Sequence, residues 1–400
     1  SIGNGTTFNL GAGSYTLTVA GNFSNSGTFT ATSGTLSVGG NWNDVGGTFT
    51  HNSGTIDFTA SSGTQTFTTL GGQTYNNITH SGAGTLQLVP WLYRKQITIS
   101  STMVSTENQS NFPVLLYEAS DANLAAGAQA DGDDIVITSS DGTTKLSHEI
   151  EKFTSATGEL WLWVKVPTLS ASSNTTLYMY YGNSTTSSQQ DATNVWDSNF
   201  KGVWHLKETG TGAAGDYQDS TSNNNDSTNT TGQPTATASG QVDGGESFNG
   251  SSNYIDIGQK DLATTAITFG GWVKPGDTST QGTLVGKNGY DLSTGGYTIQ
   301  INTGGSGAVL YDVNPSRMDG VVATSQLTAG TWYYIMVTYS NPYITLYING
   351  SQVGSPTNRG EITIPSFAKS LQIGKQDVAG YLRYLSGTID EVRISNSARA

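Results

Sequence analysis

Apolar and polar residues alternate over short stretches along almost the whole chain. In Leu36–Val38 and in Ile56–Phe58, every second residue is apolar, which is the pattern of a β-strand that buries one face. Clusters of Gly, Asn and Ser separate these stretches, as expected for turns between strands. Only Ala122–Ala130 indicates a helical turn. The pattern therefore predicts an all-β chain built from many short strands.

The first 90 residues contain an internal repeat. The segment Leu17–Phe29 recurs as Leu36–Phe49, about 20 residues further along, and a looser copy follows at Thr64–Thr68 and Tyr75–Thr79. One such unit cannot bury its apolar face alone, whereas stacked copies can, so the repeat favours a β-solenoid over residues 1–90. A small sandwich of hairpins is the alternative. The repeats resemble those of secreted bacterial and archaeal surface proteins and adhesins.

A second region begins after Val89-Pro90, which marks a domain boundary. Its apolar stretches alternate as strands do, and they lie at Trp91–Ile99, Asn111–Leu116, Asp131–Ile137, Leu146–Glu151, Glu159–Val166 and Thr176–Asn183. This order resembles an uncharacterised β-sandwich domain that often precedes laminin-G-like modules in exported proteins, with Ala192–Asp197 as its exit. We therefore expect a β-sandwich domain over residues 91–199. The resemblance implies no activity.

The third region is organised around Gly245–Ile257. Asn249-Gly250 favours a tight turn between two strands, because Gly250 adopts a positive φ without steric cost. Further motifs follow in the order of a known family, at Gly202–Glu208, Asp219–Asp226, Ile267–Pro275, Thr331–Ser340, Ile344–Gly354 and Ser386–Ser395. Together they resemble the laminin-G-like, concanavalin A-like sandwich of secreted and cell-surface proteins. The resemblance implies a two-sheet antiparallel jelly roll over residues 200–400, with 202–206 beside 387–394. Modules of this kind bind sugars, bind proteins or serve as spacers.

Charge and composition exclude several classes of partner. The formal net charge is −13, which argues against nucleic acid and anionic membrane surfaces because both require a basic face. No apolar run approaches the roughly 18 residues of a membrane span, so we expect no membrane insertion. The chain has no Cys and shows no signal peptide. We expect it to begin either at a mature N-terminus or inside a longer precursor.

An oxygen-rich loop is the strongest candidate for a metal site. Asp219–Asp226 reads DSTSNNND, and Ca²⁺ prefers six to eight hard oxygen ligands. The spacing is not that of an EF-hand. Resemblance to related sandwiches adds an Asp of the last strand, which is Asp390 here. The expected ligands of a structural Ca²⁺ are therefore Asp219, Asn225, Asp226 and Asp390. The alternative is a loop closed by Asx-turns without metal.

The sequence predicts that the protein is not an enzyme. Glu149 and Glu151 share one face of a strand, and paired carboxylates serve glycoside hydrolysis. However, glucanases with the concanavalin A-like fold place their acids on one strand as Glu-x-Asp with a further Glu, and that pattern is absent from the third region. We expect Glu149 and Glu151 to form an exposed strand face. The chain has no Gly-x-Ser-x-Gly elbow before a helix.

Aromatic residues offer candidate sugar-binding groups. Trp161, Trp163, Trp272 and Trp332-Tyr333 alternate with Leu, Val and Ile in strong strands, so a core role is favoured for them. Better candidates for binding lie among Gly-rich or polar segments, namely Tyr290, Tyr297, Tyr311, Tyr381 and Tyr384.

These features predict an extracellular or cell-surface structural and adhesive protein that assembles into a filament or layer. The edge strands Thr7–Leu10 and Tyr15–Val19 are neutral and β-prone, and the nearest Lys or Arg is Arg94. Such an edge favours head-to-tail contact between copies of the chain, which builds a fibre. The alternative is a set of glycan-binding accessory modules of a larger secreted protein, with surface glycans or proteins as partners. An enzyme is the third choice.

Overall fold

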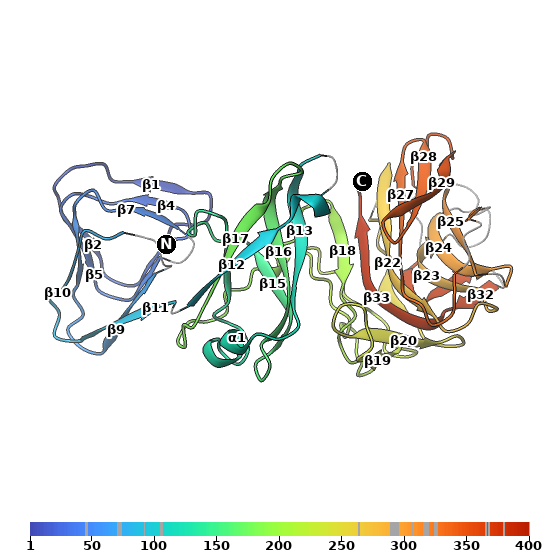
Figure 1. Cartoon of the computed structure of the whole chain (residues 1–400), viewed down its shortest axis with the longest axis horizontal. Coiled ribbons are helices and arrows are strands. Elements are labelled where there is room, and N and C mark those ends of the chain that lie inside the picture. The colour runs from blue at the N-terminus through green and yellow to red at the C-terminus, as the bar shows by residue number, and fades with distance from the viewer. Residues whose placement is uncertain are drawn as a thin grey trace. The chain divides into compact units, whose positions relative to one another are not determined.

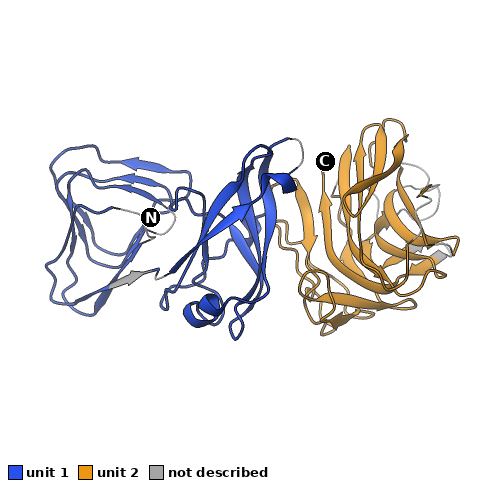
Figure 2. Cartoon of the chain, in the orientation of Figure 1, with its two compact units in different colours: residues 1–195 blue, residues 196–400 orange. Residues whose placement is uncertain are grey.

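The computed structural model describes residues 1–44, 47–69, 74–91, 93–104, 107–262, 265–288, 296–305, 307–314, 320–323, 327–364, 366, 369–378 and 381–399. The chain forms two compact units, residues 1–195 and 196–400 (Figure 2). The second unit thus begins at Trp196, close to the expected domain start at residue 200. No helix among the described residues is long and apolar enough to cross a membrane.

The repeat region is a β-solenoid of parallel sheets (Figure 1, blue). One sheet contains β1 (Thr7–Asn9), β4 (Thr28–Thr30) and β7 (Thr48–Thr50). Another contains β2 (Leu17–Val19), β5 (Thr35–Val38), β8 (Thr55–Phe58) and β10 (Asn77–His80). The third contains β3 (Phe23–Ser24), β6 (Trp42–Asp44), β9 (Thr64–Thr69) and β11 (Thr85–Pro90). The solenoid prediction is confirmed, and a sandwich of hairpins is excluded because these strands pair in parallel.

Stacked aromatic rings fill the solenoid. Equivalent residues of successive repeats pair in register, so that Phe29 lies opposite Phe49 and Phe23 opposite Trp42. The rings of Phe23 and Trp42 stack at a centroid distance of 4.1 Å. A buried polar pair completes the same repeat, in which Asn25 Nδ2 donates to Asp44 Oδ1 at 2.8 Å. Each repeat therefore buries its inward face against the next one.

The rest of the first unit is an antiparallel sandwich. One sheet contains β12 (Tyr93–Ile99), β17 (Thr175–Tyr181) and β14 (Val136–Thr138), and the other contains β13 (Gln109–Glu118), β16 (Glu159–Leu169) and β15 (His148–Thr154). The expected helical turn is α1 (Ala122–Gly127), whose Asp121 caps the N-terminus by accepting from the backbone N–H groups of Asn123 and Leu124. Short 3₁₀ turns lie at η1 (Ser101–Met103) and η2 (Ala192–Asn194).

The second unit is a sandwich of two antiparallel sheets. The larger sheet contains β19 (Thr235–Thr237), β20 (Gly245–Asn249), β33 (Ser386–Ser395), β22 (Ala266–Pro275), β27 (Tyr333–Ser340), β28 (Tyr343–Ile348) and β29 (Ser351–Asn358), with β18 (Phe200–Trp204) also paired to β33. The other contains β21 (Ile255–Gly258), β30 (Leu371–Ile373), β23 (Gly282–Asn288), β24 (Gly296–Thr303), β25 (Ala308–Asn314) and β26 (Val321–Ala323). A hairpin of β31 (Lys375–Val378) and β32 (Tyr381–Tyr384) accompanies them.

The prediction that residues 202–206 lie beside residues 387–394 is confirmed, because β18 pairs with β33. Gly202 pairs with Ile394, and Trp204 with Val392. The Asn249-Gly250 turn also forms, with Gly250 at φ +75°. There Asn249 Oδ1 accepts from the backbone N–H groups that follow it. The apolar side chains of both sheets, such as those of Phe269 and Ile299, meet in one buried core.

Candidate binding site

A polar pocket of about 460 Å³ lies at the surface of the second unit. Its lining comes from β18, from the Asp219–Asp226 loop, from the segment after β21 and from the end of β33. The lining residues are Lys201, Asn223, Asn225, Gln259, Lys260, Asp261, Leu262 and Asn396. Amide and charged side chains dominate this lining, so the pocket suits a ligand that both donates and accepts hydrogen bonds.

The Asp219 carboxylate organises the loop that forms one wall of the pocket. Asp219 Oδ1 accepts from Val203 N at 3.0 Å and from Thr221 N at 2.9 Å. Asp219 Oδ2 accepts from Thr221 Oγ1 and from Asn225 N, both at 2.9 Å. Burial raises the pKa of Asp219, and these hydrogen bonds oppose the rise. The loop thus folds as a set of Asx-turns that fixes its amides at the pocket.

The residues predicted as metal ligands lie in two places. Asp219, Asn225 and Asp226 are brought together, since Asp226 Oδ1 accepts from Asp219 N at 2.8 Å and Asn225 N donates to Asp219. Asp390 instead accepts from the backbone N–H groups of Gln241 and Val242, at 2.7 and 2.8 Å. Asp219, Asp226 and Asp390, all described in the structure, do not bring three ligand atoms within 4.8 Å of one another. A calcium ion shared by all the predicted ligands therefore stays a prediction.

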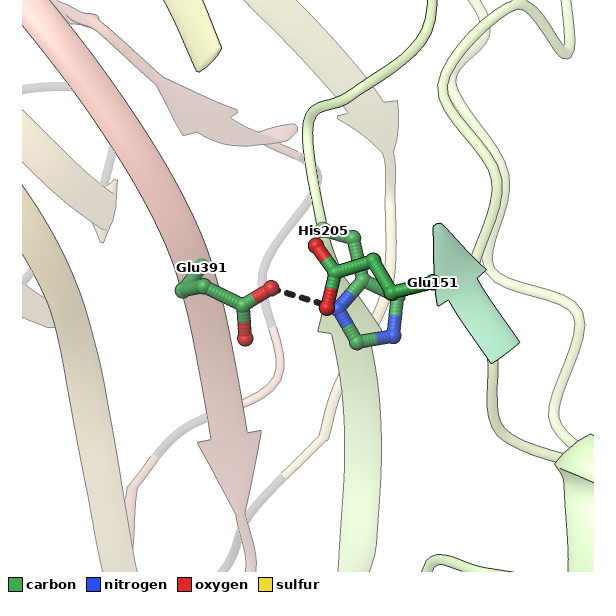
Figure 3. Close-up of side chains that lie close together, drawn as sticks. All are labelled: Glu151, His205 and Glu391. Carbon is green, nitrogen blue, oxygen red and sulfur yellow. Dashed lines mark hydrogen bonds and ion pairs between the residues drawn. The ribbon is translucent and has the colours of Figure 1, made fainter. Parts of the chain in front are cut away.

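A buried ion pair lies beside Asp390. His205 Nδ1 contacts Glu391 Oε1 at 2.5 Å (Figure 3), and the guanidinium of Arg393 pairs with the other oxygen of Glu391. Burial favours the neutral acid, but His205 and Arg393 outweigh it and lower the pKa of Glu391 to about 2. Burial and the charge of Glu391 raise the pKa of Asp390 to about 8. No sequence pattern pointed to this pair, because its partners are far apart in the chain.

The pocket offers both donors and acceptors. Lys201 Nζ donates one hydrogen bond to the carbonyl of Ser198, at 2.8 Å. An ammonium group has three N–H donors, so two more remain. Within the described part of the chain, the Lys260 side chain makes no polar contact, and the Oδ1 atoms of Asn223 and Asn225 accept no hydrogen bond. These groups are available to a ligand.

Buried contacts hold the opposite wall of the pocket in place. Lys287 is 2 % exposed, donates to the carbonyl of Lys260 at 2.9 Å and pairs with the carboxylate of Asp261. The other oxygen of Asp261 accepts from Ser366 Oγ. These contacts hold the segment from Lys260 to Leu262 in place, so this wall of the pocket keeps its shape without a ligand.

The expectation that Glu149 and Glu151 form an exposed strand face is wrong. Both side chains are buried, and Glu151 Oε2 accepts from Trp163 Nε1 at 2.6 Å. The neighbouring His148 is fully buried, and burial lowers its pKa to about 4. The pairing register shifts between Ile150 and Lys152. This shift does not separate the two carboxylates, which share a face as alternation predicts. The expectation failed because that face is covered, which a sequence pattern does not tell.

The structure also reassigns the aromatic candidates. Tyr297 and Tyr311 are core residues, because β24 and β25 turn these positions towards the facing sheet. Tyr384 is half-buried and lies near Tyr254, with Lys375 Nζ 4.4 Å from the Tyr254 ring and 5.4 Å from the Tyr384 ring. Tyr290 and the side chain of Tyr381 lie outside the described residues.

The tryptophans expected in the core differ in burial, although Trp161 and Trp163 lie on the same face of β16. Trp163 is buried. Trp161 and Trp272 are only half-buried, and they pack on Tyr117 and Tyr334 respectively. The core expectation is therefore wrong for Trp161 and Trp272, since sequence alternation does not tell which face of a sheet is covered.

Comparisons with known structures give distant likenesses. Domain 4 of an extracellular arabinanase from Geobacillus stearothermophilus, in complex with arabinotriose, shares 18% identity, with 50% of this chain and 94% of that chain covered and a TM-score of 0.38. The CBM40 of Ruminococcus gnavus IT-sialidase shares 13% identity, covering 39% and 91%, with a TM-score of 0.33. A putative carbohydrate binding protein from Bacteroides ovatus shares 13% identity, covering 77% of each chain, with a TM-score of 0.34.

Family models match two regions of the chain. The comparison with curated proteins found no match for the chain. Residues 131–210 match a model described as Domain of unknown function (DUF2341). Residues 248–400 match the model of the Concanavalin A-like lectin/glucanases superfamily. The chain therefore carries, after its β-solenoid, a domain of unknown function and a C-terminal domain of the concanavalin A-like lectin/glucanase superfamily.

Proposed function

We propose that the second unit is a saccharide-binding module of an extracellular protein, and that it binds rather than cleaves its ligand. The polar pocket carries this proposal. One wall of the pocket, Gln259–Leu262, and Asn396 lie in the region that matches a superfamily of lectins and glucanases. The buried His205–Glu391 pair adds no support for catalysis, since both side chains are 2 % exposed or less.

The donors and acceptors of the pocket match the chemistry of a sugar. Each sugar hydroxyl donates one hydrogen bond and accepts others. The Oδ1 atoms of Asn223 and Asn225 would accept from hydroxyls, and the Lys201 and Lys260 ammonium groups would donate to hydroxyl or carboxylate oxygens. An array of neutral and acidic oligosaccharides, followed by calorimetric titration of the best ligand, tests this function.

Single substitutions in the pocket make this test specific to its residues. Asn223→Ala and Lys260→Ala each remove a group of the pocket, so we expect about tenfold weaker binding for both. Lys260→Ala should leave the melting temperature unchanged, whereas Asn223→Ala should also lower it, because Asn223 Nδ2 donates to the carbonyl of Phe200 at 3.0 Å. Gln352→Ala is the matched control, because Gln352 is exposed on the edge strand β29. Binding to no glycan, or equal binding by all three variants and the wild type, would contradict the proposal.

A second proposal concerns assembly, and an exposed ring at the solenoid end supports it. Phe8 is 46% exposed and stacks on the buried Phe29 with centroids 5.9 Å apart, so it is the outermost ring of the stack among the described residues. Its strand β1 lies at the edge of its sheet, where β4 is its partner. We propose that a second copy of the chain covers this edge by β-augmentation, which would give a self-assembling, adhesive surface protein.

Charged residues placed on this edge test the assembly. β2 is the edge strand of the neighbouring sheet at the same end of the solenoid. Thr16→Lys combined with Thr18→Lys charges β2, and deletion of residues 1–19 removes both β1 and β2. Either change should leave monomers in sedimentation velocity under conditions in which the wild type forms polymers. Met103→Lys is the control, because Met103 is exposed far along the chain from the edge. An intact protein that stays monomeric at high concentration, or edge variants that still polymerise, would show that this edge is not the joint.

A further inference from the structure

An aromatic pair lies on the outer face of one sheet in the first unit. On β16, Leu160 and Leu162 belong to the core of the sandwich, so Trp161 between them faces outward. On β13, Leu116 packs against the same core, and the neighbouring Tyr117 faces outward as well. Packing in that core therefore does not account for these two rings.

The two rings form a single platform. Tyr117 and Trp161 are directly opposite each other in the antiparallel pairing of β13 and β16. Their ring centroids are 3.8 Å apart and the planes are inclined by 33°. Tyr117 is nevertheless 55% exposed. Trp163 lies on the same face of β16 and is buried, so this face is open to solvent at its Tyr117 end, where an exposed ring pair marks a binding surface.

A charged rim orients the indole and borders the platform. Trp161 Nε1 donates to Glu159 Oε1 at 3.0 Å, and Thr154 Oγ1 donates to Glu159 Oε2 at 3.2 Å. Lys152 Nζ lies 3.5 Å from the same carboxylate. The hydrogen bond from Trp161 lowers the pKa of Glu159, so this carboxylate is ionised at neutral pH. The rings are thus flanked by a fixed acceptor and a cation.

We propose that Tyr117 and Trp161 form a saccharide-binding site in the domain of unknown function, which takes a pyranose ring of an oligosaccharide. The C–H groups on one face of such a ring are apolar and flat, and they stack on aromatic rings, while its equatorial hydroxyls point sideways to polar groups. Glu159 and Lys152 lie where they would bind those hydroxyls. A protein partner would require a far larger apolar surface than one ring pair. The site is separate from the polar pocket and does not depend on it.

Titration of the full chain with cellohexaose and with xylohexaose tests the site. β-1,4-linked glucose and xylose rings carry equatorial hydroxyls, so both probes present flat apolar faces. Binding is measured by calorimetry and by the change in Trp fluorescence. We expect Trp161→Ala and Tyr117→Ala to weaken binding by at least about tenfold. Tyr117→Phe keeps the ring and should bind within about twofold of the wild type.

Two control variants distinguish the platform from other binding surfaces of the chain. Tyr343→Ala removes a tyrosine that is 47% exposed in the second unit, so it should leave the titration unchanged. Lys260→Ala removes a donor of the polar pocket, so it reports any part of the binding that occurs at that pocket. Glu159→Gln should weaken binding by a smaller factor than loss of either ring.

The proposal is overturned if neither hexasaccharide binds. It is equally overturned if Tyr117→Ala, shown to be folded by its circular dichroism, binds as the wild type does. Binding that Lys260→Ala abolishes and Tyr117→Ala leaves intact would overturn the platform and support the pocket. A ring pair that only stabilises the sheet would change the melting temperature without changing binding.

Discussion

The solenoid and the C-terminal sandwich satisfy their buried polar groups in different ways. In the solenoid, partners come from the adjacent repeat, as when Asn25 pairs with Asp44, 19 residues away. In the sandwich, Glu391 meets His205 across 186 residues, and Asp390 meets Gln241 across 149. The solenoid buries the Asp44 carboxylate among rings and amides, whereas the sandwich buries ionisable groups beside one another, as with His205, Asp390 and Glu391. Repeat architecture therefore keeps interactions local, whereas the charge interactions of the sandwich join strands that are distant in the sequence.

The largest effect is expected for a solenoid ring. Trp42 is fully buried between Phe23 and Phe67, so Trp42→Ala should cost about 3–5 kcal/mol of stability, since the stack cannot close over the cavity. Because contacts are local, the loss should be confined to the solenoid. Hydrogen exchange, resolved by segment, measures it. Phe8→Ala, at the exposed end of the same stack, is the control and should cost far less. An equal loss of protection from hydrogen exchange in the C-terminal sandwich would contradict the expectation that solenoid contacts are local.

A somewhat smaller loss is expected in the sandwich from His205→Ala. This substitution leaves the buried Glu391 with Arg393 alone, and removing one partner of a buried ion pair costs about 3 kcal/mol. Urea unfolding followed in the second unit measures the change. His51→Ala is the matched solenoid variant. His51 Nδ1 accepts a hydrogen bond from Ser53 N at 2.9 Å, and losing this contact should lower the stability by less than about 1 kcal/mol. A similar cost for both histidines would remove the distinction between the two regions.

The pH dependence of stability should also reside in the sandwich. Glu246 is fully buried beside Tyr217, and burial together with Glu208 raises its pKa to about 8. The folded state therefore holds a proton that the unfolded state has released, so the stabilising contribution is complete below about pH 4.5 and is lost as the pH rises towards 8.

Glu246→Gln should remove this part of the dependence. The variant should be more stable than the wild type at pH 8, by on the order of 1 kcal/mol, and its advantage should shrink at pH 5. Denaturant unfolding at both pH values measures this. Glu361→Gln is the control, because Glu361 is exposed. If the stability of the wild type does not fall between pH 5 and pH 8, relative to that of Glu246→Gln, the burial argument is wrong.

The smallest expected effect is that of calcium. If Asp390 and the Asp219–Asp226 loop serve a structural Ca²⁺, a chelator should lower the melting temperature of the second unit by a few degrees, because only the folded state binds the ion. Asp390→Ala should then melt lower in calcium and lose its response to the chelator. An unchanged melting curve of the wild type with chelator would end the metal hypothesis and leave the loop as a set of hydrogen-bonded turns.

Local pattern predicted much of the architecture. The repeat of Leu17–Phe29 at Leu36–Phe49 determined the solenoid, since in-register stacking places like residues on like residues. Asn249-Gly250 determined its turn because glycine alone tolerates the left-handed backbone there at no cost. The family resemblance placed β18 beside β33. Each of these depends on neighbours in sequence or on an ordered set of motifs.

Only the tertiary structure decided which faces are covered. Sequence alternation shows that Trp161 and Leu162 face opposite ways, but not which of them lies in the core. The polar surroundings of Tyr297 in the sequence favoured a binding role for it, and Glu149 was expected to face solvent, yet both side chains are buried. The polar pocket joins Lys201, Lys260 and Asn396 from distant segments. Burial and ligand geometry arise from contacts across the whole unit, which no local pattern contains.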